Sequence, residues 1–512
     1  MKIRKRKIWK NYVWDQTIDP LKYFKPTCLA DLITIVKSAS TRGYHVKPIG
    51  SGHSSSDIAL STDYMIDTHG LDRMLNTNLL SLRPGAVGAP GAAGALEKPG
   101  SIVLVECGIR LHALNKLLDD QGMALYNMGA YTGQTLAGVV STSTHGSGIS
   151  LGAFPEYVEA IVLLGEDGEL YHLERSGDRA LSTAPIRLDT DVPIHFVQSD
   201  EDFLAAGVSM GCMGIIYAVA LRVRSSYMLN ETRSFGRWSE VRQLLEKGDV
   251  LRDNRHYEVL INPYRYKGRD YKCLVTARNI EEKIKKGPLI PRGHRKLAYE
   301  LPLLLVPDFI LNALMRMVIN WFPRFVPDLV QMLISTLTVK GYIDKSYKVL
   351  DLGKANNLAA YATEIAFPEH RYLDAVDAII DIVAKDVAEG RQYLSAPFSL
   401  RFVRTNAFPL AMQYGKLGSF VCMIEFPTVN RTIGGMETLS RIESAMYAFG
   451  GIPHWGQVNH VGGTGKASLA RLYPEFNNWL SVYRKYCRKG MFENDFTRRC
   501  GISAVDALLF HE

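Results

Sequence analysis

The stretch Lys47–Ser61, KPIGSGHSSSDIALS, decides how the rest of the chain is organised. Its two glycines lack Cβ atoms, so the backbone can turn sharply there and approach a ligand closely. Free backbone N–H groups and serine hydroxyls in such a loop can form a nest that binds an anion. The loop predicts a phosphate cradle, although a plain Gly/Ser turn with an exposed histidine has the same composition. The residues that we expect at the ligand are Gly50, Ser51, Gly52, His53, Ser54 and Ser55.

The residues before this loop are predicted to form a helix and then a strand that leads directly into the loop. Leu29–Arg42 has apolar residues at helical spacing and is followed by Gly43, a typical C-cap. His45–Pro48 then reads as a short strand. A strand that leads into a glycine loop is an arrangement suited to binding a phosphate.

A second run rich in glycine and hydroxyl residues covers Tyr126–Ser150, YNMGAYTGQTLAGVVSTSTHGSGIS. Its length and density indicate a second ligand-binding segment; the alternative is a turn region around a buried histidine. A β-hairpin with an Asp-Gly turn is predicted over Val158–Leu173. The residues of the second run that we expect at the ligand are Gly129, Thr135, Gly138, Ser141, Thr144, His145, Gly146 and Gly148.

Three regions of the chain resemble the sugar-lactone oxidases of the vanillyl-alcohol-oxidase flavoprotein family, and they occur in the family's order. GSGHSSSDIALS resembles the family's GGGHSxSDIA loop, and Tyr126–Ser150 is similar to its GxxAGxxxxxTHGxG run. Gly207–Arg224 resembles the strand near the adenine, with Gly214 and Ile215 as contacts. The resemblance implies FAD as the cofactor. In many members the histidine at the position of His53 is joined covalently to the flavin.

The resemblance also implies an α+β fold. An FAD-binding domain of the PCMH type, with two subdomains, is expected over residues 1–226, and an α+β substrate cap over 227–467. Residues 468–512 are expected to return to the FAD-binding domain. A chain of 512 residues is too long for one simple core, which agrees with this division. Leu79–Leu82 and Ser101–Glu106 are predicted to pair on either side of a flexible loop.

Flavin-linked oxidation of an alcohol needs an acceptor for the hydroxyl proton and a positive charge near the reduced flavin. PHWG at Pro453–Gly456 resembles a family motif that continues with a lysine, but here Gln457 follows. FSLRFV at Phe398–Val403 resembles a Glu-x-Arg pair in which Arg401 is kept and Ser399 replaces the glutamate. The resemblance thus implies a catalytic set of Arg401, His454, Ser399 and Gln457.

The replacement for the missing glutamate stays open at this point. His454, Glu364, Glu425 and His460 are the candidates, and a structural role on strands is the alternative for the two glutamates. The changes at Ser399 and Gln457 predict a less polar pocket. Gly129 matches a position that is often glycine in family members that use oxygen; the alternative is a turn glycine with positive φ.

Residues 297–339 are strongly apolar, but charged residues and prolines keep every run shorter than a membrane-spanning helix. They predict either buried cap helices or a surface that lies on a membrane, aided by the basic lead-in Lys2–Lys10. Seven scattered cysteines without a CxxC motif, and no signal peptide, indicate the cytoplasm or the cytoplasmic face of a membrane.

The leading hypothesis is an FAD-dependent oxidase of a sugar lactone or polyol, a small-molecule alcohol, with electrons passed to O2. One alternative is a covalent-flavin oxidase of a sterol or other membrane-derived alcohol. Another is a membrane-associated flavin-binding protein with little oxidase activity. The net charge of +8 comes without a basic stripe, so nucleic acid is not an expected partner, and no metal site is expected.

Overall fold

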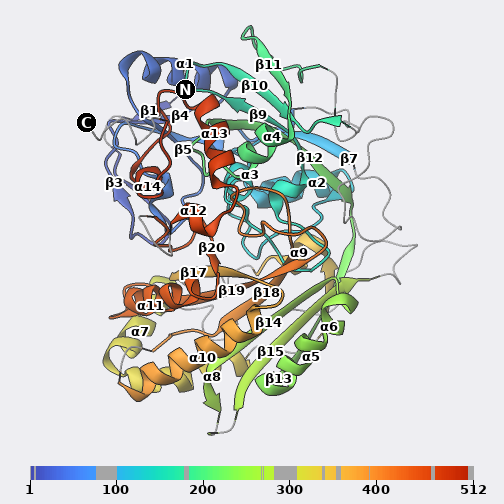
Figure 1. Ribbon diagram of the computed structural model, residues 1–512, viewed down its shortest axis with the longest axis vertical. Helices are drawn as coiled ribbons and strands as arrows, with labels where there is room; N and C mark the ends of the chain where they lie inside the picture. The colour runs from blue at the N-terminus through green and yellow to red at the C-terminus, as the bar shows by residue number, and fades with distance from the viewer. Residues whose placement is uncertain are drawn as a thin grey trace.

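The computed structural model of the chain describes residues 2–4, 7–75, 101–177, 181, 184–266, 268, 270–281, 308–336, 341–352, 359–390, 393–462 and 468–504. Figure 1 shows two regions along the longest axis, with the N-terminal strands in the upper region and the largest sheet in the lower one. Leu79–Leu82 and the loop after it, together with residues 297–307 and 337–339, lie outside the described residues.

The upper region contains a four-stranded sheet that carries the first glycine loop. Its strand order is β1-β4-β6-β5, in which β5 and β4 both run parallel to β6. Helix α1 (Leu29–Arg42) packs its apolar face against this sheet and ends at Gly43, whose φ of 65° is the left-handed conformation of a C-cap. The strands are β1 (Lys2–Arg4), β4 (Lys22–Lys25), β5 (Val46–Ile49) and β6 (Tyr64–Asp67), and a separate pair is β2 (Trp9–Lys10) with β3 (Thr17–Ile18).

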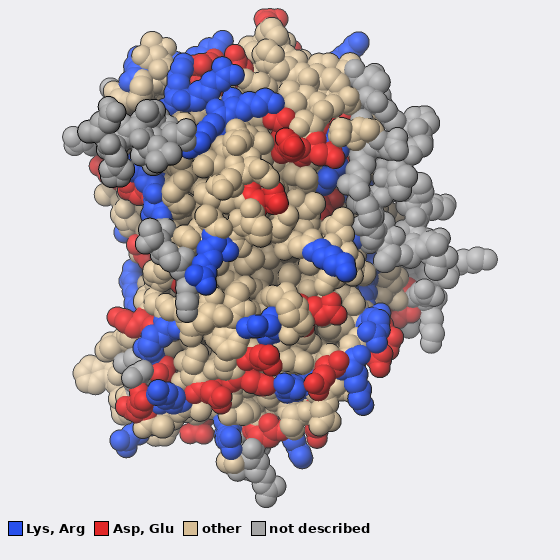
Figure 2. All heavy atoms as spheres, viewed as in Figure 1, with Lys and Arg blue, Asp and Glu red and all other residues tan. Residues whose placement is uncertain are grey.

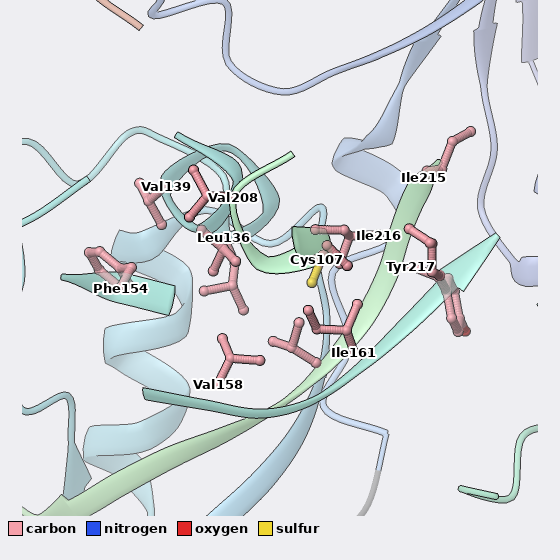
Figure 3. Packing of buried hydrophobic residues seen from close by; sticks show 14 of the residues in the cluster. Cys107, Leu136, Val139, Phe154, Val158, Ile161, Val208, Ile215, Ile216 and Tyr217 are labelled. Carbon is pink, nitrogen blue, oxygen red and sulfur yellow. The ribbon is translucent and has the colours of Figure 1, made fainter. Parts of the chain in front are cut away.

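A second sheet of the upper region has the order β11-β10-β9-β12-β7, with β8 paired to β12. Figure 3 shows Leu136 and Val139 of α3 gathered with Val158 and Ile161 of β9 in the core on this sheet. The strands are β7 (Ser101–Glu106), β8 (Met123–Ala124), β9 (Val158–Leu164), β10 (Leu170–Glu174), β11 (Ile194–Gln198) and β12 (Ile215–Ser225). The helices are α2 (Leu111–Asp120), α3 (Leu136–Ser141) and α4 (Asp200–Gly207).

The lower region is built on an eight-stranded sheet of order β16-β13-β15-β14-β18-β19-β17-β20. Its strands are β13 (Met228–Arg237), β14 (His256–Tyr266), β15 (Asp270–Ile280), β16 (Tyr342–Lys345), β17 (Ala360–Pro368), β18 (Phe398–Arg404), β19 (Phe420–Val429) and β20 (Ile452–Pro453). The helices are α5 (Trp238–Lys247), α6 (Asp249–Asp253), α7 (Asp308–Trp321), α8 (Val326–Thr336), α9 (Ser346–Leu350), α10 (Tyr372–Ala388) and α11 (Gly435–Tyr447).

The two faces of this sheet differ because side chains alternate along a strand. On β18, Phe398, Leu400 and Phe402 point into a hydrophobic core with the apolar faces of α10 and α11. Ser399 and Arg401, which alternate with them, line a cavity on the other face. Residues of β17 and β19 follow the same rule. The sheet therefore places a row of polar side chains opposite the glycine-rich segments.

The C-terminal helices lie in the upper region, among the N-terminal strands (Figure 1). They are α12 (Leu469–Leu472), α13 (Phe476–Tyr486) and α14 (Asp495–Arg499). The Val46 amide donates to the Met491 carbonyl at 2.8 Å, and Trp479 Nε1 donates to the Ala205 carbonyl at 3.1 Å. The domain boundaries at 226/227 and 467/468 stay predictions.

Most local predictions agree with the described structure. The helix over Leu29–Arg42 is found with the bounds expected, and the predicted hairpin is formed by β9 and β10. The strand expected over His45–Pro48 begins and ends one residue later, as β5. Strand β7 pairs with β12, a partner that is distant in sequence.

Helices α7 and α8 have one buried and one exposed apolar side. Ile319, Val326, Val330 and Ile334 are buried, whereas a second set of large apolar residues is exposed. None of the helices in the described part of the chain has the length and apolarity needed to cross a bilayer. The exposed set is Ile310, Leu314, Met317, Trp321, Phe322, Phe325 and Met332.

Candidate active site

A cavity of about 620 Å³ lies between the glycine-rich segments and the polar row of the eight-stranded sheet. It brings together residues from all the predicted motifs. The predicted cofactor residues that line it are Gly50, Ser51, Gly52, His53, Ser54, Ser55, Gly129, Thr135, Gly138, Ser141, Thr144, His145, Gly214 and Ile215. The predicted catalytic residues that line it are Ser399, Arg401, His454 and Gln457.

Two predicted cofactor residues, Gly146 and Gly148, are not among the residues that line the cavity. A Cβ atom on Gly146 would lie 2.1 Å from Asn127 Oδ1, and Gly148 has a φ of 120° and donates its amide to the Phe402 carbonyl. Gly146 is needed where the backbone packs against Asn127 and Met128, and Gly148 where it packs against β18 and Arg255. Spacing in a glycine-rich run does not distinguish a glycine that contacts a ligand from one that lets two backbone segments pack, and their role as ligand contacts stays a prediction.

The first glycine loop is held by the PHWG segment, which follows it by about four hundred residues. The Ser55 amide donates to the Gly456 carbonyl at 2.8 Å, and Ser56 Oγ donates to the Trp455 carbonyl at 2.7 Å. A Cβ atom on Gly50 would lie 2.1 Å from Thr135 Oγ1, so only glycine allows the two glycine-rich segments to approach this closely.

His53 lies between two tyrosines that sequence reasoning did not single out. Its ring is stacked on Tyr131 with 4.1 Å between centroids, and the Tyr12 ring centroid lies at 4.6 Å. Burial lowers the pKa of His53 to about 4, so the imidazole is neutral near pH 7. His53 Nδ1 is buried and has no hydrogen-bond partner within the protein. A buried polar atom normally has a partner, so this nitrogen is available to water, a ligand or a covalent bond.

Ser51 is fixed by a chain of polar contacts below the loop. Its hydroxyl donates to the Gly133 carbonyl, and Ser51 Oγ lies 3.2 Å from His69 Nε2, while His69 Nδ1 lies 2.6 Å from Asp67 Oδ1. Burial opposes ionisation of Asp67, but hydrogen bonds from His69, Lys25 and Tyr23 hold the pKa of its carboxyl well below the usual value. Because the serine proton goes to a carbonyl oxygen, this arrangement positions the loop rather than activating a nucleophile.

Two carboxylates and one guanidinium form the centre of the polar row. Glu364 of β17 and Glu425 of β19 are directly opposite each other in the antiparallel register. Arg401 Nη2 donates to Glu364 Oε1 at 2.7 Å and to Glu425 Oε2 at 2.6 Å. Like charges in this position repel each other, and Arg401 offsets the repulsion. Both glutamates therefore line the cavity and bind its guanidinium, in addition to their place on the strands.

Gln457 and the two histidines complete this cluster. Gln457 Nε2 donates to Glu425 Oε1 at 3.0 Å and to Glu364 Oε2 at 3.4 Å. His145 Nδ1 donates to the Gly146 carbonyl, and its Nε2 lies 3.4 Å from Glu364 Oε2. Burial opposes ionisation of Glu364, but the charges of Arg401 and His145 outweigh it and hold the pKa of that carboxyl well below its usual value.

Charged residues that were not predicted extend the cavity wall. Glu258 of β14 is paired in register with Arg401, and Arg278 binds Glu258 at 2.9 Å and Glu231 at 2.8 Å. Arg233 also lines the cavity. These charges make the cavity wall polar away from Ser399 and Gln457, and they come from strands that no motif marks. The signal in the sequence was a pair of charged residues two positions apart on β13, Glu231 and Arg233, which alternation places on one face of the sheet.

Comparison with known proteins agrees with this geometry. The family model for D-arabinono-1,4-lactone oxidase matches residues 219–500, and a model for an FAD binding domain matches residues 20–174. An L-gulono-1,4-lactone dehydrogenase of Mycobacterium tuberculosis is 25% identical over 96% of this chain and 98% of its own length. An L-gulonolactone oxidase of Mus musculus is 23% identical over 96% of this chain and 97% of its own length.

A solved structure gives the same fold. The crystal structure of cholesterol oxidase from Brevibacterium sterolicum superimposes with a TM-score of 0.73 over 98% of this chain and 97% of that chain. Its sequence identity of 12% makes this a likeness of fold alone. It agrees with an FAD-binding fold of the PCMH type, as the resemblance implied.

The fold and the cavity define an FAD-dependent oxidoreductase that acts on an alcohol group of a small molecule. The chain belongs to the D-arabinono-1,4-lactone oxidase family, whose model covers more than half of it. The residues present fit FAD: two glycine-rich segments meet at one cavity, and a buried histidine nitrogen beside them has no protein partner.

Proposed function

We propose that the protein oxidises a hydroxyl-bearing carbon of a sugar lactone or polyol and passes the electrons to O2. Bound FAD would supply the electron acceptor for the substrate. The observation that carries the proposal is the charged cluster at the cavity. Arg401 Nε and Gln457 Oε1 are buried there without a hydrogen-bond partner within the protein. The hydroxyl groups of a polyhydroxylated substrate can satisfy both atoms, whereas a sterol ring system cannot.

The experiment is anaerobic mixing of the purified protein with a panel of aldonolactones, polyols and sterols, with flavin absorbance recorded. We expect bleaching of the flavin by at least one lactone or polyol and none by sterols. Bleaching by sterols alone would replace this proposal with the sterol oxidase alternative. No bleaching by any member of the panel would favour a flavin-binding protein without oxidase activity.

We also propose that FAD is joined covalently to His53. The unpartnered Nδ1 atom and the neutral state of the buried imidazole support this, since a neutral ring nitrogen is a nucleophile. After acid precipitation, the flavin absorbance should remain with the wild-type protein, and His53→Ala should leave none in the pellet. His460→Ala is the matched control, because His460 does not line the cavity and is half exposed. Release of all flavin from the wild type contradicts the covalent link.

Reaction with O2 is proposed from the position of Gly129. Its φ is not positive, so the turn alternative does not explain the glycine. Gly129 lines the cavity, and a Cβ atom there would lie 3.2 Å from the His145 carbonyl oxygen. Gly129→Ala should lower the rate at which O2 reoxidises the reduced flavin, while anaerobic reduction by substrate changes less. Equal reoxidation rates in both proteins would show that Gly129 has no part in oxygen access.

Peripheral binding to a bilayer surface is proposed for the exposed side of α7 and α8. Ile310, Leu314, Met317 and Trp321 follow helical spacing along one side of α7. Trp321, Phe322 and Phe325 cluster at the turn between the helices around exposed Arg324, a combination suited to the boundary between acyl chains and headgroups. The basic lead-in does not join this surface, because β1 lies in the upper region and α7 in the lower one (Figure 1).

Figure 2 agrees with this separation: Lys and Arg side chains gather at the upper end, whereas both signs are interspersed over the lower half. Co-sedimentation with liposomes of neutral and of anionic lipid, at low and high salt, tests the proposal. Binding that persists at high salt and is lost in a Trp321→Ser/Phe325→Ser variant supports it. Protein that remains in the supernatant throughout, or that only forms a concentration-dependent dimer, overturns it.

A further inference from the structure

Ser399 stands where the family resemblance places a glutamate, and the structure provides a carboxylate next to it on another strand. In the antiparallel register of β18 and β19, Ser399 is directly opposite Glu425. Ser399 Oγ donates to Glu425 Oε2 across 3.5 Å, a long contact. Both residues line the cavity. Because side chains of a directly opposed pair project from the same face of a sheet, Glu425 reaches the space beside Ser399.

The substitution at Gln457 belongs to the same arrangement. The amide of Gln457 donates to Glu425 without adding a positive charge to the cluster. The two departures from the family pattern together remove one negative and one positive charge. Arg401 then faces the two carboxylates of Glu364 and Glu425, and both are within hydrogen-bond distance of its Nη2 atom.

The other three candidates for the proton acceptor do not fit the geometry. Glu364 is 3% exposed and accepts contacts from Arg401, Gln457 and His145, which hold it as a carboxylate. His454 Nδ1 accepts a hydrogen bond from the Gly456 amide at 3.0 Å, so the neutral ring carries its proton on Nε2 and acts as a donor. His460 binds Glu443 and does not line the cavity.

Glu425 differs from Glu364 in access. Its side chain is 27% exposed, against 3% for Glu364, although both bind the same guanidinium nitrogen. A carboxylate has about four lone-pair positions, and the contacts of Glu425 with Arg401, Gln457 and Ser399 leave room for a substrate hydroxyl. Glu425 is therefore the carboxylate of the cluster that a molecule in the cavity can reach.

We propose that Glu425 is the catalytic residue that accepts the proton of the substrate hydroxyl, in place of the glutamate lost at Ser399. This inference rests on the proposed alcohol oxidation. Bound FAD would accept the hydrogen and the electron pair of the carbinol C–H bond. The O–H bond breaks with its proton going to the Glu425 carboxylate, and a C=O bond forms. The substrate thus loses two hydrogens and two electrons: one hydrogen with the electron pair would go to FAD, and the other goes as a proton to Glu425.

Glu425→Gln tests the proposal, because the amide keeps the shape of the side chain and an oxygen for Arg401 but accepts no proton. The limiting rate of anaerobic flavin reduction by the best substrate should fall by about a hundredfold or more, as for loss of a general base. The substrate affinity of the oxidised protein, from the perturbation of flavin absorbance, should change much less. Unchanged flavin content and melting temperature show that the variant folds.

Moving the carboxylate to the neighbouring strand distinguishes a catalytic role of Glu425 from a structural one, because only a catalytic role predicts recovery of the rate. Ser399→Glu in the Glu425→Gln background places a carboxylate at the same site from the opposite strand, β18. We expect the double variant to reach at least a tenth of the wild-type rate of flavin reduction. His460→Ala is the control and should keep the wild-type rate. A wild-type rate in Glu425→Gln overturns the inference, as does failure of the double variant to recover when it is folded and flavin-loaded. If the wild type oxidises no member of the panel, the proposed function fails instead.

Discussion

Arg401 holds two carboxylates through one nitrogen atom, and its substitution should affect both catalysis and folding. In Arg401→Ala the Glu364 and Glu425 carboxylates face each other without a cation. Breaking a buried pair in this way costs about 3–5 kcal/mol of unfolding free energy. Loss of the charge at the substrate should also lower kcat by about a hundredfold or more. Urea denaturation and steady-state rates measure the two effects, and wild-type turnover would show that the site lies elsewhere in the cavity.

His454 makes the stability of the protein depend on pH. Burial lowers its pKa to about 4 from the ordinary value of 6.5, so the unfolded chain takes up a proton between these values while the native protein does not. Its contribution is therefore present above pH 6.5 and is lost as the pH falls towards 4, by up to about 1.4 kcal/mol per pH unit.

Unfolding free energies of the wild type and of His454→Gln, measured across this range, check the prediction. The variant should lose less stability on acidification. It lacks one of the buried histidines that take up a proton when the chain unfolds. Burial also lowers the pKa of His53 to about 4. Part of the pH dependence of stability therefore remains in both proteins. Parallel pH profiles for the two proteins would mean that His454 does not contribute.

At the scale of the element, the two sides of α8 should respond differently to the same change. Ile334 is fully buried against the cap, whereas Met332 is 53% exposed. Ile334→Ala leaves a cavity in the core and should cost about 2–5 kcal/mol of unfolding free energy. Met332→Ala should stay within about 0.5 kcal/mol, as for a surface position. Similar losses in both variants would show that the exposed side is covered in solution.

The strand pair β18 and β19 illustrates what an element contributes to chemistry. Its register places Ser399 against Glu425, and β17 adds Glu364 against Glu425 from the other side. A shift by one residue would turn each of these side chains to the hydrophobic face, where Leu400 and Ile424 now lie. The apolar residues of the strands thus specify the position of the polar ones.

At the scale of the whole molecule, the C-terminal segment links the first glycine loop to the segment that follows β20. Arg499 Nη2 binds Asp57 at 2.8 Å and Asn459 Oδ1 at 3.2 Å, and its Nη1 donates to the Val461 carbonyl. Asp57 follows the first glycine loop, and Asn459 follows the PHWG segment. One side chain of the C-terminal segment therefore joins two segments that also carry cavity-lining residues.

Arg499→Ala should lower both the melting temperature and the amount of flavin that the protein retains without covalent attachment, in a His53→Ala background. Removing these partly buried bonds should cost about 1–3 kcal/mol. Arg498→Ala is the matched control, since the neighbouring Arg498 is mostly exposed and binds only Asp495 three residues earlier among its described contacts. Equal melting temperatures and equal flavin retention in the two variants would mean that the bonds of Arg499 do not stabilise the cavity.

The sequence by itself determined the features that depend on a few neighbouring residues. The glycine loop around His53, the helix that ends at Gly43 and the β9–β10 hairpin were predictable, because backbone freedom and periodicity act over short distances. Family resemblance added the cofactor and the departures at Ser399 and Gln457. Sequence spacing also predicted Gly146 and Gly148 as ligand contacts, and these two are not among the residues that line the cavity.

Only the tertiary structure decided which charged groups meet. Glu364 and Glu425 looked like ordinary strand residues, and His460 looked as suitable as either of them. Strand pairing placed both glutamates on Arg401 and left His460 outside the cavity, and it brought Glu258 and Arg278 to the wall. The physical reason is that register and strand order depend on burial of apolar faces over the whole sheet, which no local pattern encodes.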